Sequence, residues 1–404
     1  MVEWKEYRIK DLGEVVTGNT PPTSNREYYG TEYKFIKPTD MVEGQRFVST
    51  TEEYYSELAY QKYKKCLLPP KTPCVVTIGS LGKKMCLTDT ECFTNQAVNA
   101  VIPNKENDGE FLYYAFKASV LAYVKQLDSG TTSGRENVSK SSFSKIKVRV
   151  PPLPTQQKIA SILSAYDNLI QNYKKQIEAL QTAASELYKE WFVRFRFPGY
   201  QTTNFENGIP EGWKVYLIKD LCYINKKTVS SKDAKKEILY LDTGSITENV
   251  IDSFESYILE EAPSRARRIV KKNSIIFSTV RPNQNHYGIL KTVPENLIVS
   301  TGFAVFDPKF DIANILYFFL SSKDFVDYCQ MIAEGAVATY PSIKPEEIGK
   351  VKILLPTMDL AIKLNHSFES LFLRIENLKQ QITNLTQQRD LLLPRLMSGK
   401  LEVE

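Results

Sequence analysis

Apolar residues recur along two stretches of this chain in alternating steps of four and three residues. This heptad pattern is typical of a helix that packs lengthwise against a partner helix. It predicts one helix over residues 159–191, about 50 Å long if unbroken, and another over residues 364–396. The first pattern consists of Ile159, Leu163, Tyr166, Ile170, Tyr173, Ile177, Leu180, Ala184, Leu187 and Trp191. The second consists of Leu364, Phe368, Leu371, Ile375, Leu378, Ile382, Leu385, Leu392 and Leu396, interrupted at Arg389.

The two predicted helices are copies of one another, and so are the segments that precede them. The chain therefore contains one unit twice, each consisting of a globular lobe followed by a long helix. Matching pairs are Ile177 with Ile382 and Pro151 with Pro356 at an offset of 205 residues, and Trp4 with Trp213 and Ile9–Leu12 with Ile218–Leu221 at an offset of 209.

Short runs rich in β-branched and aromatic residues fill the first 153 residues and alternate with turn-forming segments, as in a mixed α/β lobe. We expect one helix there, near residues 111–127. Two polar loops, at residues 18–30 and 129–137, are candidates for ligand contact, because functional loops are held by rigid scaffolds. The predicted strands cover residues 33–36, 74–78, 97–102 and 146–150.

Prolines mark the ends of the predicted helices. The prolines at 151–154 stop the last strand of the first lobe, and Thr155 is expected to cap the helix that follows. Pro394 is expected to kink or end the second helix. The predicted fold is α+β, with two similar lobes separated by two long antiparallel coiled-coil helices in a pseudo-two-fold repeat. Its segments are 1–153 (lobe 1), 154–196 (first helix), 197–212 (linker), 213–357 (lobe 2), 358–396 (second helix) and 397–404 (tail).

The composition is that of a globular protein, with 42% apolar and 25% charged residues. No run of about 18 apolar residues is present and the N-terminus lacks the apolar core of a signal peptide, so we expect a cytoplasmic protein without membrane association. Six scattered cysteines form no Cys-x-x-Cys pair, and only two histidines accompany them. This disfavours a structural zinc site and predicts reduced, mostly buried thiols.

The net charge of +5 permits a polyanionic partner without requiring one. Two short runs of cations lie in lobe 2, where residues 265–272 hold five and residues 226–236 hold another five. A solvated charged face would explain either run alone equally well.

Known catalytic motifs are missing from the sequence. It contains no phosphate-binding Gly-x-x-x-x-Gly-Lys-Ser/Thr loop, no His-Glu-x-x-His, no Gly-x-Ser-x-Gly elbow and no Asn-Pro-Pro-Tyr of an amino-methyltransferase. His286, in a polar loop, is expected to be a surface or contact residue rather than a base. We expect a binding protein and not an enzyme.

An antiparallel pair of copied helices would give pseudo-two-fold symmetry, and two unlike lobes would suit two different half-sites on duplex DNA. Together with the order and doubling of its motifs, this pattern resembles, over the whole chain, the specificity subunit of a type I restriction–modification enzyme. The motifs that carry the resemblance lie at residues 4–5, 18–21, 151–157, 189–195, 209–214 and 392–401.

The resemblance implies that each lobe is a target recognition domain for one half of a bipartite, asymmetric DNA sequence. The helices would set the spacer between the halves and recruit two modification (methyltransferase) subunits. Double-stranded DNA and these subunits would be the partners, together with restriction subunits where the system has them. No cofactor is expected in this chain, because S-adenosylmethionine and ATP would belong to the partner subunits.

Lobe 2 departs from the pattern at its end, where Thr-Met-Asp-Leu-Ala at 357–361 stands where lobe 1 has Thr-Gln-Gln at 155–157. A partner contact there is expected to be altered. Arg281 and Gln284 are the candidate base readers, because Arg pairs with guanine and Gln with adenine through two hydrogen bonds. Aromatic residues such as Tyr28 are expected to pack. The candidate DNA-contacting residues are Thr20, Arg26, Lys83, Ser133 and Arg135 in lobe 1, and Arg265, Arg267, Arg281, Asn283, Gln284, Asn285 and Tyr340 in lobe 2.

Two alternatives stay open on the sequence alone. In the first, the lobes bind protein and the chain is a coiled-coil interaction scaffold; strongly salt-dependent binding of duplex DNA would argue against it. In the second, the chain recognises DNA for a methylation or restriction system of another type, which neighbouring genes would distinguish.

Overall fold

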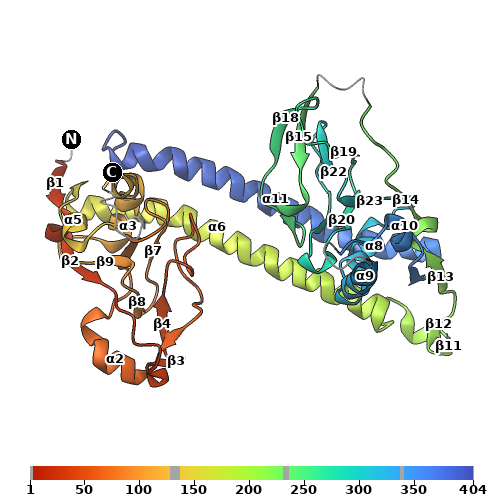
Figure 1. The fold of residues 1–404 in the computed structure, drawn as a ribbon, viewed down its shortest axis with the longest axis horizontal. Helices are drawn as coiled ribbons and strands as arrows, with labels where there is room; N and C mark the ends of the chain where they lie inside the picture. Colours follow the sequence, from red (N-terminus) through yellow and green to blue (C-terminus); the bar gives the residue numbers. More distant parts are fainter. Residues whose placement is uncertain (1–2, 128–136, 231–235, 337–340, 404) are drawn as a thin grey trace. The chain divides into compact units, whose positions relative to one another are not determined.

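The computed structural model describes residues 3–127, 137–230, 236–336 and 341–403, which form two compact units (Figure 1). Unit 1 comprises Met1–Lys174 and Gln381–Glu404, and unit 2 comprises Lys175–Gln380. Each unit therefore contains one lobe together with part of each long helix. Three candidate contact residues, Ser133, Arg135 and Tyr340, lie outside the described residues.

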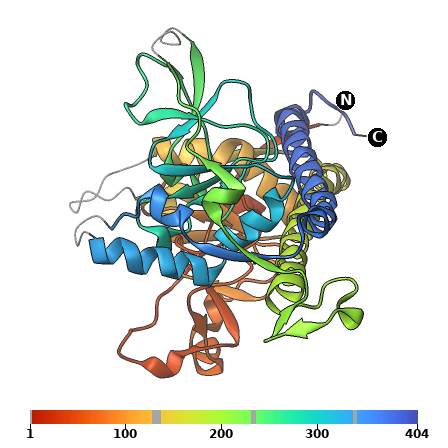
Figure 2. The same ribbon diagram turned by 90° about the vertical axis from the view of Figure 1, so that its right-hand side faces the viewer.

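Lobe 1 is built on two four-stranded sheets. Figure 2 turns the view so that the green and blue elements of lobe 2 face the viewer. The first is antiparallel, with the order β2-β9-β6-β7; the second has the order β3-β5-β4-β8, with β4 and β8 parallel. β1 and β10 form a separate antiparallel pair. The strands are β1 (Lys5–Arg8), β2 (Gly13–Thr17), β3 (Tyr29–Gly30), β4 (Tyr33–Ile36), β5 (Tyr54–Tyr55), β6 (Pro73–Val76), β7 (Met85–Leu87), β8 (Cys92–Thr94), β9 (Val98–Pro103) and β10 (Lys147–Val150). The helices are α1 (Ile9–Leu12), α2 (Glu57–Tyr63), α3 (Gly109–Ala115), α4 (Leu121–Gln126) and α5 (Lys140–Ser144).

Lobe 2 repeats this topology, with sheet orders β14-β23-β20-β21 and β18-β15-β22-β19. The parallel partners Tyr240 and Ile298 lie 205 residues after the parallel partners Phe35 and Phe93 of lobe 1. The strands are β13 (Lys214–Leu217), β14 (Cys222–Ile224), β15 (Glu237–Leu241), β16 (Ile246–Thr247), β17 (Val250–Ile251), β18 (Glu255–Ile258), β19 (Ala266–Ile269), β20 (Ile275–Ser278), β21 (Tyr287–Ile289), β22 (Leu297–Ser300), β23 (Phe303–Pro308) and β24 (Lys352–Leu355), and a hairpin of β11 (Phe205–Glu206) and β12 (Ile209–Pro210) precedes them. The helices are α7 (Ile218–Leu221), α8 (Ala313–Leu320), α9 (Lys323–Ala336) and α10 (Pro345–Gly349).

The first sheet of each lobe is buried on both faces, which is why its strands are almost continuously apolar. In lobe 1, Val75 packs in the core that contains α3 and the long helices, whereas Cys74 and Val76 pack on residues from the second-sheet side such as Ile36. Lobe 2 divides its β20 side chains in the same way, since Phe277 faces the helices and Ile276 the other core. The sheet therefore lies rigidly between two packed layers.

The two long helices are α6 (Leu153–Tyr188), extended by a π-turn at Lys189–Val193, and α11 (Met358–Met397). In unit 1, Leu163 of α6 shares a core with Leu393 of α11. In unit 2, Trp191 packs edge-on against Phe368, with ring centroids 5.5 Å apart. Between these two contacts the residue number increases along α6, from 163 to 191, and decreases along α11, from 393 to 368. The two helices therefore run antiparallel within each unit. Every predicted heptad position is buried or half-buried.

Two expected helix boundaries are wrong. Thr155 is not the N-cap of α6, because the helix already begins at Leu153 and Pro154 falls in its first turn, where a missing N–H removes no hydrogen bond. Pro394 does not end α11, which continues to Met397. This proline lies in the last turn, where Leu393 and Leu396 are held in the core of lobe 1. Packing therefore outweighs the single lost backbone hydrogen bond.

The helix and strands expected in lobe 1 are confirmed in outline, whereas most of the polar loop expected at 129–137 lies outside the described residues. The helix predicted near 111–127 is α3 and α4 joined by a π-turn at Phe116–Val120, and the predicted strands match β4, β6, β9 and β10 within two residues. All cysteines except Cys66 are buried. No helix of the described part is long and apolar enough to cross a membrane.

Candidate nucleic-acid interface

Equivalent hairpin loops project from the first sheet of each lobe. Hairpin loop 1 (residues 77–84) joins β6 to β7, and hairpin loop 2 (residues 279–286) joins β20 to β21. Both contain eight residues at an offset of 202, since Cys74 pairs with Cys86 and Ile276 with Gly288. The two loops can thus be compared position by position.

The same hydrogen bonds support the two loops. Thr77 N–H donates to Ala97 O at 2.8 Å and Thr77 O accepts from Val138 N–H at 2.8 Å. In lobe 2, Thr279 N–H donates to Gly302 O at 2.8 Å and Thr279 O accepts from Ile343 N–H at 2.9 Å. The first residue of each loop is therefore held in the same way. Beyond it the loops differ in side chains and in backbone turn, since hairpin loop 2 contains a 3-10 turn at Pro282–Gln284.

Two candidate residues of lobe 1, Lys83 and Thr20, lie at or beside hairpin loop 1. Lys83 is exposed on the loop itself. Thr20 follows β2 and bonds through its hydroxyl to Gln96, while Asn19 N–H donates to Thr94 O at 2.9 Å. Asn137, which directly follows the segment of Ser133 and Arg135, forms a β-bridge with Ile78. Three separate segments thus converge at this edge of the lobe.

A buried polar cluster lies beneath this edge. Asn99 accepts from the Thr17 hydroxyl at 2.6 Å and donates to the Thr77 hydroxyl at 2.8 Å. Gly18 allows a close backbone approach, because a Cβ there would lie 2.1 Å from Thr94 O. These contacts hold the start of hairpin loop 1 and of the Thr20 loop against one another.

Arg26 lies on a 3-10 turn (Arg26–Tyr28) away from this group. Its neighbour Glu27 accepts a hydrogen bond from Ser56, at the start of α2, with a 2.6 Å separation between Glu27 O and Ser56 Oγ. Tyr28 is buried and packs edge-on against Tyr63, which confirms that it is a packing residue. Arg26 itself is exposed, so its assignment to DNA contact stays a prediction.

Hairpin loop 2 presents a different set of side chains. Arg281, Asn283 and Gln284 are exposed, and Arg281 N–H donates to Pro341 O at 2.9 Å, directly after Tyr340. Asn285 is half-buried and donates from its amide to Glu248 Oε1 at 2.9 Å. Asn285 therefore shapes the loop, and the outward-facing chemistry is that of the other three residues.

A helix backs each hairpin loop. In lobe 1, Gly82 lies against α4, where a Cβ would come within 2.7 Å of Leu121 O. In lobe 2, Gln330 of α9 accepts from Asn283 N–H at 3.2 Å and donates to Glu334 at 2.8 Å. Close backbone packing in one lobe is thus replaced by a side-chain hydrogen bond in the other. Sequence reasoning missed Gln330 because nothing in its local pattern connects it to a loop nearly fifty residues earlier.

Arg265 and Arg267 lie at the edge strand β19. Arg265 is exposed, and its carbonyl accepts from Thr301 N–H at 2.8 Å, next to the Gly302 that holds hairpin loop 2. Arg267 is half-buried and donates to Ala266 O at 2.9 Å. Arg265 and hairpin loop 2 are thus bonded to two consecutive residues, Thr301 and Gly302. The sequence did not indicate this proximity.

The two basic runs of lobe 2 lie side by side. Val229 N–H donates to Arg267 O at 3.0 Å, and Ile269 N–H donates to Lys227 O at 3.1 Å. Lys226, Lys227, Lys271 and Lys272 are all exposed. The runs thus form one cationic surface, which we call the β19 surface. Their pairing could not be read from sequence, where they are forty residues apart.

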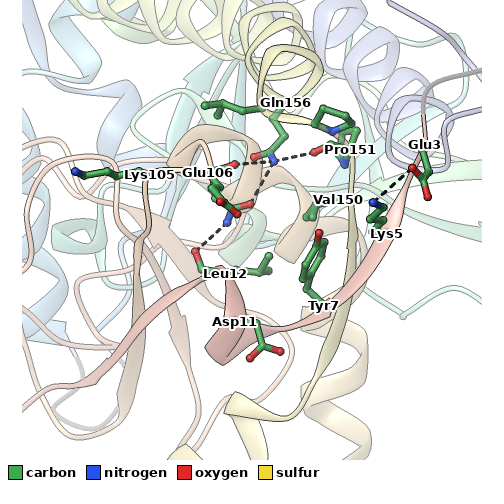
Figure 3. Close-up of a pocket in the computed structure, with 13 residues that line it drawn as sticks. Glu3, Lys5, Tyr7, Asp11, Leu12, Lys105, Glu106, Val150, Pro151 and Gln156 are labelled. Atoms are coloured by element: carbon green, nitrogen blue, oxygen red, sulfur yellow. Dashed lines mark hydrogen bonds and ion pairs between the residues drawn. The ribbon is translucent and has the colours of Figure 1, made fainter.

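A cavity of about 380 Å³ at the start of α6 is a structural feature rather than a reaction site (Figure 3). Gln156, 2% exposed, bonds through Oε1 to Asp108 N–H at 2.9 Å and through Nε2 to Pro151 O at 2.9 Å. The wall of the cavity contains the charged residues Glu3, Lys5 and Asp11, and the Glu3 and Lys5 side chains form an ion pair at 3.5 Å. Gln156 is thus occupied within lobe 1 and unavailable to a partner.

Little in the described residues is suited to covalent or metal chemistry. Burial raises the pKa of the Cys222 and Cys329 thiols to about 12, so both stay protonated and unreactive near neutral pH. The described residues bring together no group of three His, Cys, Asp or Glu side chains able to hold a metal ion. His286 Nδ1 lies 2.7 Å from Ile246 O at the base of hairpin loop 2, which is a structural contact.

The sequence matches a family model described as the type I restriction modification DNA specificity domain, over residues 1–182 and again over 210–388. The MjaIX specificity subunit of Methanocaldococcus jannaschii is 28% identical over 100% of this chain and 94% of that protein. The HindI specificity subunit of Haemophilus influenzae is 35% identical over 42% of this chain and 38% of that protein. The S subunit of a type I system from M. genitalium shares the fold, with a TM-score of 0.62, 17% identity and coverage of 98% of this chain and 96% of that one.

Proposed function

The chain belongs to the type I restriction–modification DNA specificity family, and from this membership we propose that lobe 1 and lobe 2 each read one half of a bipartite, asymmetric DNA target. The fold matches this family in having two mixed α/β lobes and two long helices. The role of the chain is DNA sequence recognition.

The observation that carries the proposal is the contrast between the hairpin loops. Their backbone supports are the same, yet hairpin loop 1 reads Gly-Ser-Leu-Gly-Lys at residues 79–83 and hairpin loop 2 reads Arg-Pro-Asn-Gln-Asn at residues 281–285. Two loops held in the same way at their first residue but carrying different hydrogen-bonding groups would read different bases. The target halves are therefore expected to be unlike.

Each group on the interface has a role in this proposal. Arg281 and Gln284 are the base readers of lobe 2, since Arg suits guanine and Gln suits adenine. The lysines of the β19 surface contact phosphates, which position the protein without reading sequence. In lobe 1, the residues that contact DNA are Thr20 and Lys83. Gln330 and Asn99 orient the loops without touching DNA.

Partner subunits supply the chemistry in this proposal. Two modification subunits carrying S-adenosylmethionine bind the long helices, and ATP belongs to a restriction subunit. Four apolar residues on these helices are exposed and are candidate contacts: Ile162, Leu169, Leu373 and Leu391.

The proposal is tested by expressing the chain with its modification subunit and mapping the methylated sites in the host genome. We expect one motif with two unlike halves separated by unread bases. Replacing residues 281–285 by the lobe 1 sequence Gly-Ser-Leu-Gly-Lys should change one half of the motif and leave the other intact. A continuous or palindromic motif would contradict the proposal that each lobe reads one half of the target. If the assembled complex showed no salt-dependent DNA binding, a protein-binding scaffold would be favoured.

A further inference from the structure

The heptad pattern of α11 is interrupted by Arg389, and unit 1 shows what this charge contacts. Arg389 Nη1 lies 2.6 Å from Asp167 Oδ1 of α6, with the two side chains only 11% and 10% exposed. Asp167 also accepts from the Tyr114 hydroxyl of α3 at 2.6 Å. A buried ion pair thus joins the two long helices and lobe 1.

The internal repeat identifies the matching positions in unit 2. Phe372 lies 205 residues after Asp167, and Ala184 lies 205 residues before Arg389. Both belong to the apolar core of unit 2, where Phe372 packs against Phe318, 5.9 Å away between ring centroids. Phe318, at the offset of 204 seen for its neighbours, takes the place of Tyr114. At these matching positions unit 1 has a charged pair, and unit 2 has apolar residues.

This difference matters because the helices are copies. The same antiparallel pattern would allow α6 to pair with α6 of a second chain, or α11 with α11. In an α6–α6 pair, Asp167 would face Ala184 of the other chain, and in an α11–α11 pair Arg389 would face Phe372. A buried charge without its partner is strongly destabilising, whereas the observed arrangement leaves one charged pair and one apolar pair.

We propose that Asp167 and Arg389 make α6 select α11 as its partner and reject a second copy of itself. Asp167 exerts the stronger selection, because Arg389 also contacts the adjacent, half-exposed Asp390 at 2.8 Å and would keep that partner in any pairing. Heptad packing stabilises the association of the helices, and the ion pair determines which helix is the partner.

The test uses the full-length chain carrying charge reversals. Asp167→Arg alone and Arg389→Asp alone each place like charges together, and each is expected to lower the Tm by roughly 5–10 °C. The double variant Asp167→Arg with Arg389→Asp should recover most of this loss. Co-expressed with different affinity tags, the two single variants should copurify as a one-to-one dimer, because each α6 then finds its opposite charge on the other chain.

Two further variants make the outcome decisive. Asp167→Phe with Arg389→Ala copies unit 2 and should fold with a Tm within about 5 °C of the original, but should not copurify with either charge-reversed chain. Two original chains with different tags should not copurify through the helices. The proposal is overturned if the double reversal fails to recover the Tm, if the single variants do not copurify, or if the apolar variant loses as much stability as a single reversal.

Discussion

Individual side chains on hairpin loop 2 offer distinct hydrogen-bonding patterns from a well-supported backbone. Arg281 carries a planar fork of donors, Gln284 carries one donor group beside one acceptor, and the Asn285 amide donates to Glu248. Arg281 and Gln284 are exposed on the loop, and in the proposed function their removal should alter base choice.

Replacing Arg281 by Ala should relax the target at one base position and cost about 1–3 kcal/mol of binding free energy for the preferred base. The measurement is competition binding of the assembled complex to duplexes that vary one position at a time. Lys350→Ala removes an equal charge from an exposed residue paired with Glu347 and serves as the control. Unchanged discrimination in Arg281→Ala would show that another residue reads that base.

At the scale of secondary-structure elements, each hairpin loop depends on a helix behind it. Gly82 and Gln330 reach the same end by different means, close packing in lobe 1 and a hydrogen bond in lobe 2. The first turns of α6 and α11 are likewise fastened by different residues. Gln156 holds the segment before α3, while in lobe 2 Asn365, one turn beyond the equivalent Ala361, accepts from Asn314 N–H at 2.9 Å.

Gln330→Ala should weaken recognition of the half-site read by lobe 2, because Asn283 loses the acceptor that holds its backbone. Recognition of the other half-site should not change, and neither should the Tm by more than a few degrees. The exchange Gln330→Glu with Glu334→Gln retains an acceptor for Asn283 and a donor for the neighbouring carboxylate, and should restore recognition. Methylation-site mapping of both variants measures the effect, and equal weakening of both half-sites would argue for a general structural role.

Gln156→Ala should lower the free energy of unfolding by about 2 kcal/mol, since it leaves a buried backbone N–H and carbonyl without their partner. Asn365→Ala should have a similar effect on unit 2, because it removes the acceptor at the N-terminus of α8. Gln157→Ala, an exposed neighbour, is the control. Thermal unfolding measures all three, and a Gln156 variant as stable as the control would mean that water replaces the lost contacts.

At the scale of the whole molecule, the repeat and its long helices could be predicted because a heptad pattern extends over many residues and so averages out local exceptions. The effect of the prolines could not, since Pro154 and Pro394 both lie inside helices, and packing against lobe 1 retains the last turn of α11. The candidate site was found only in part. Individual candidates such as Lys83 and Arg281 lie on the hairpin loops, but the β19 surface and the Asp167–Arg389 pair arise from contacts across forty to over two hundred residues.

DNA binding by the complex should weaken steeply with salt, since the β19 surface places several lysines where phosphates would lie. Each lysine that contacts a phosphate contributes a slope of about −0.9 to the plot of log K against log salt concentration. Replacing Lys226, Lys227 and Lys271 by Ala should therefore flatten that slope by up to about 3 without changing the methylated motif. A changed motif would mean that one of these lysines reads a base.

The backbone of Arg281 carries a further consequence. Its φ of +46° lies in the left-handed region, and the equivalent residue of hairpin loop 1 is Gly79, with a φ of +75°. A side chain at such a position costs roughly 1 kcal/mol or more, which glycine avoids. Arg281→Gly should therefore raise the stability of lobe 2 while removing the contribution of Arg281 to base recognition. The loop thus carries this side chain at a cost in folding stability.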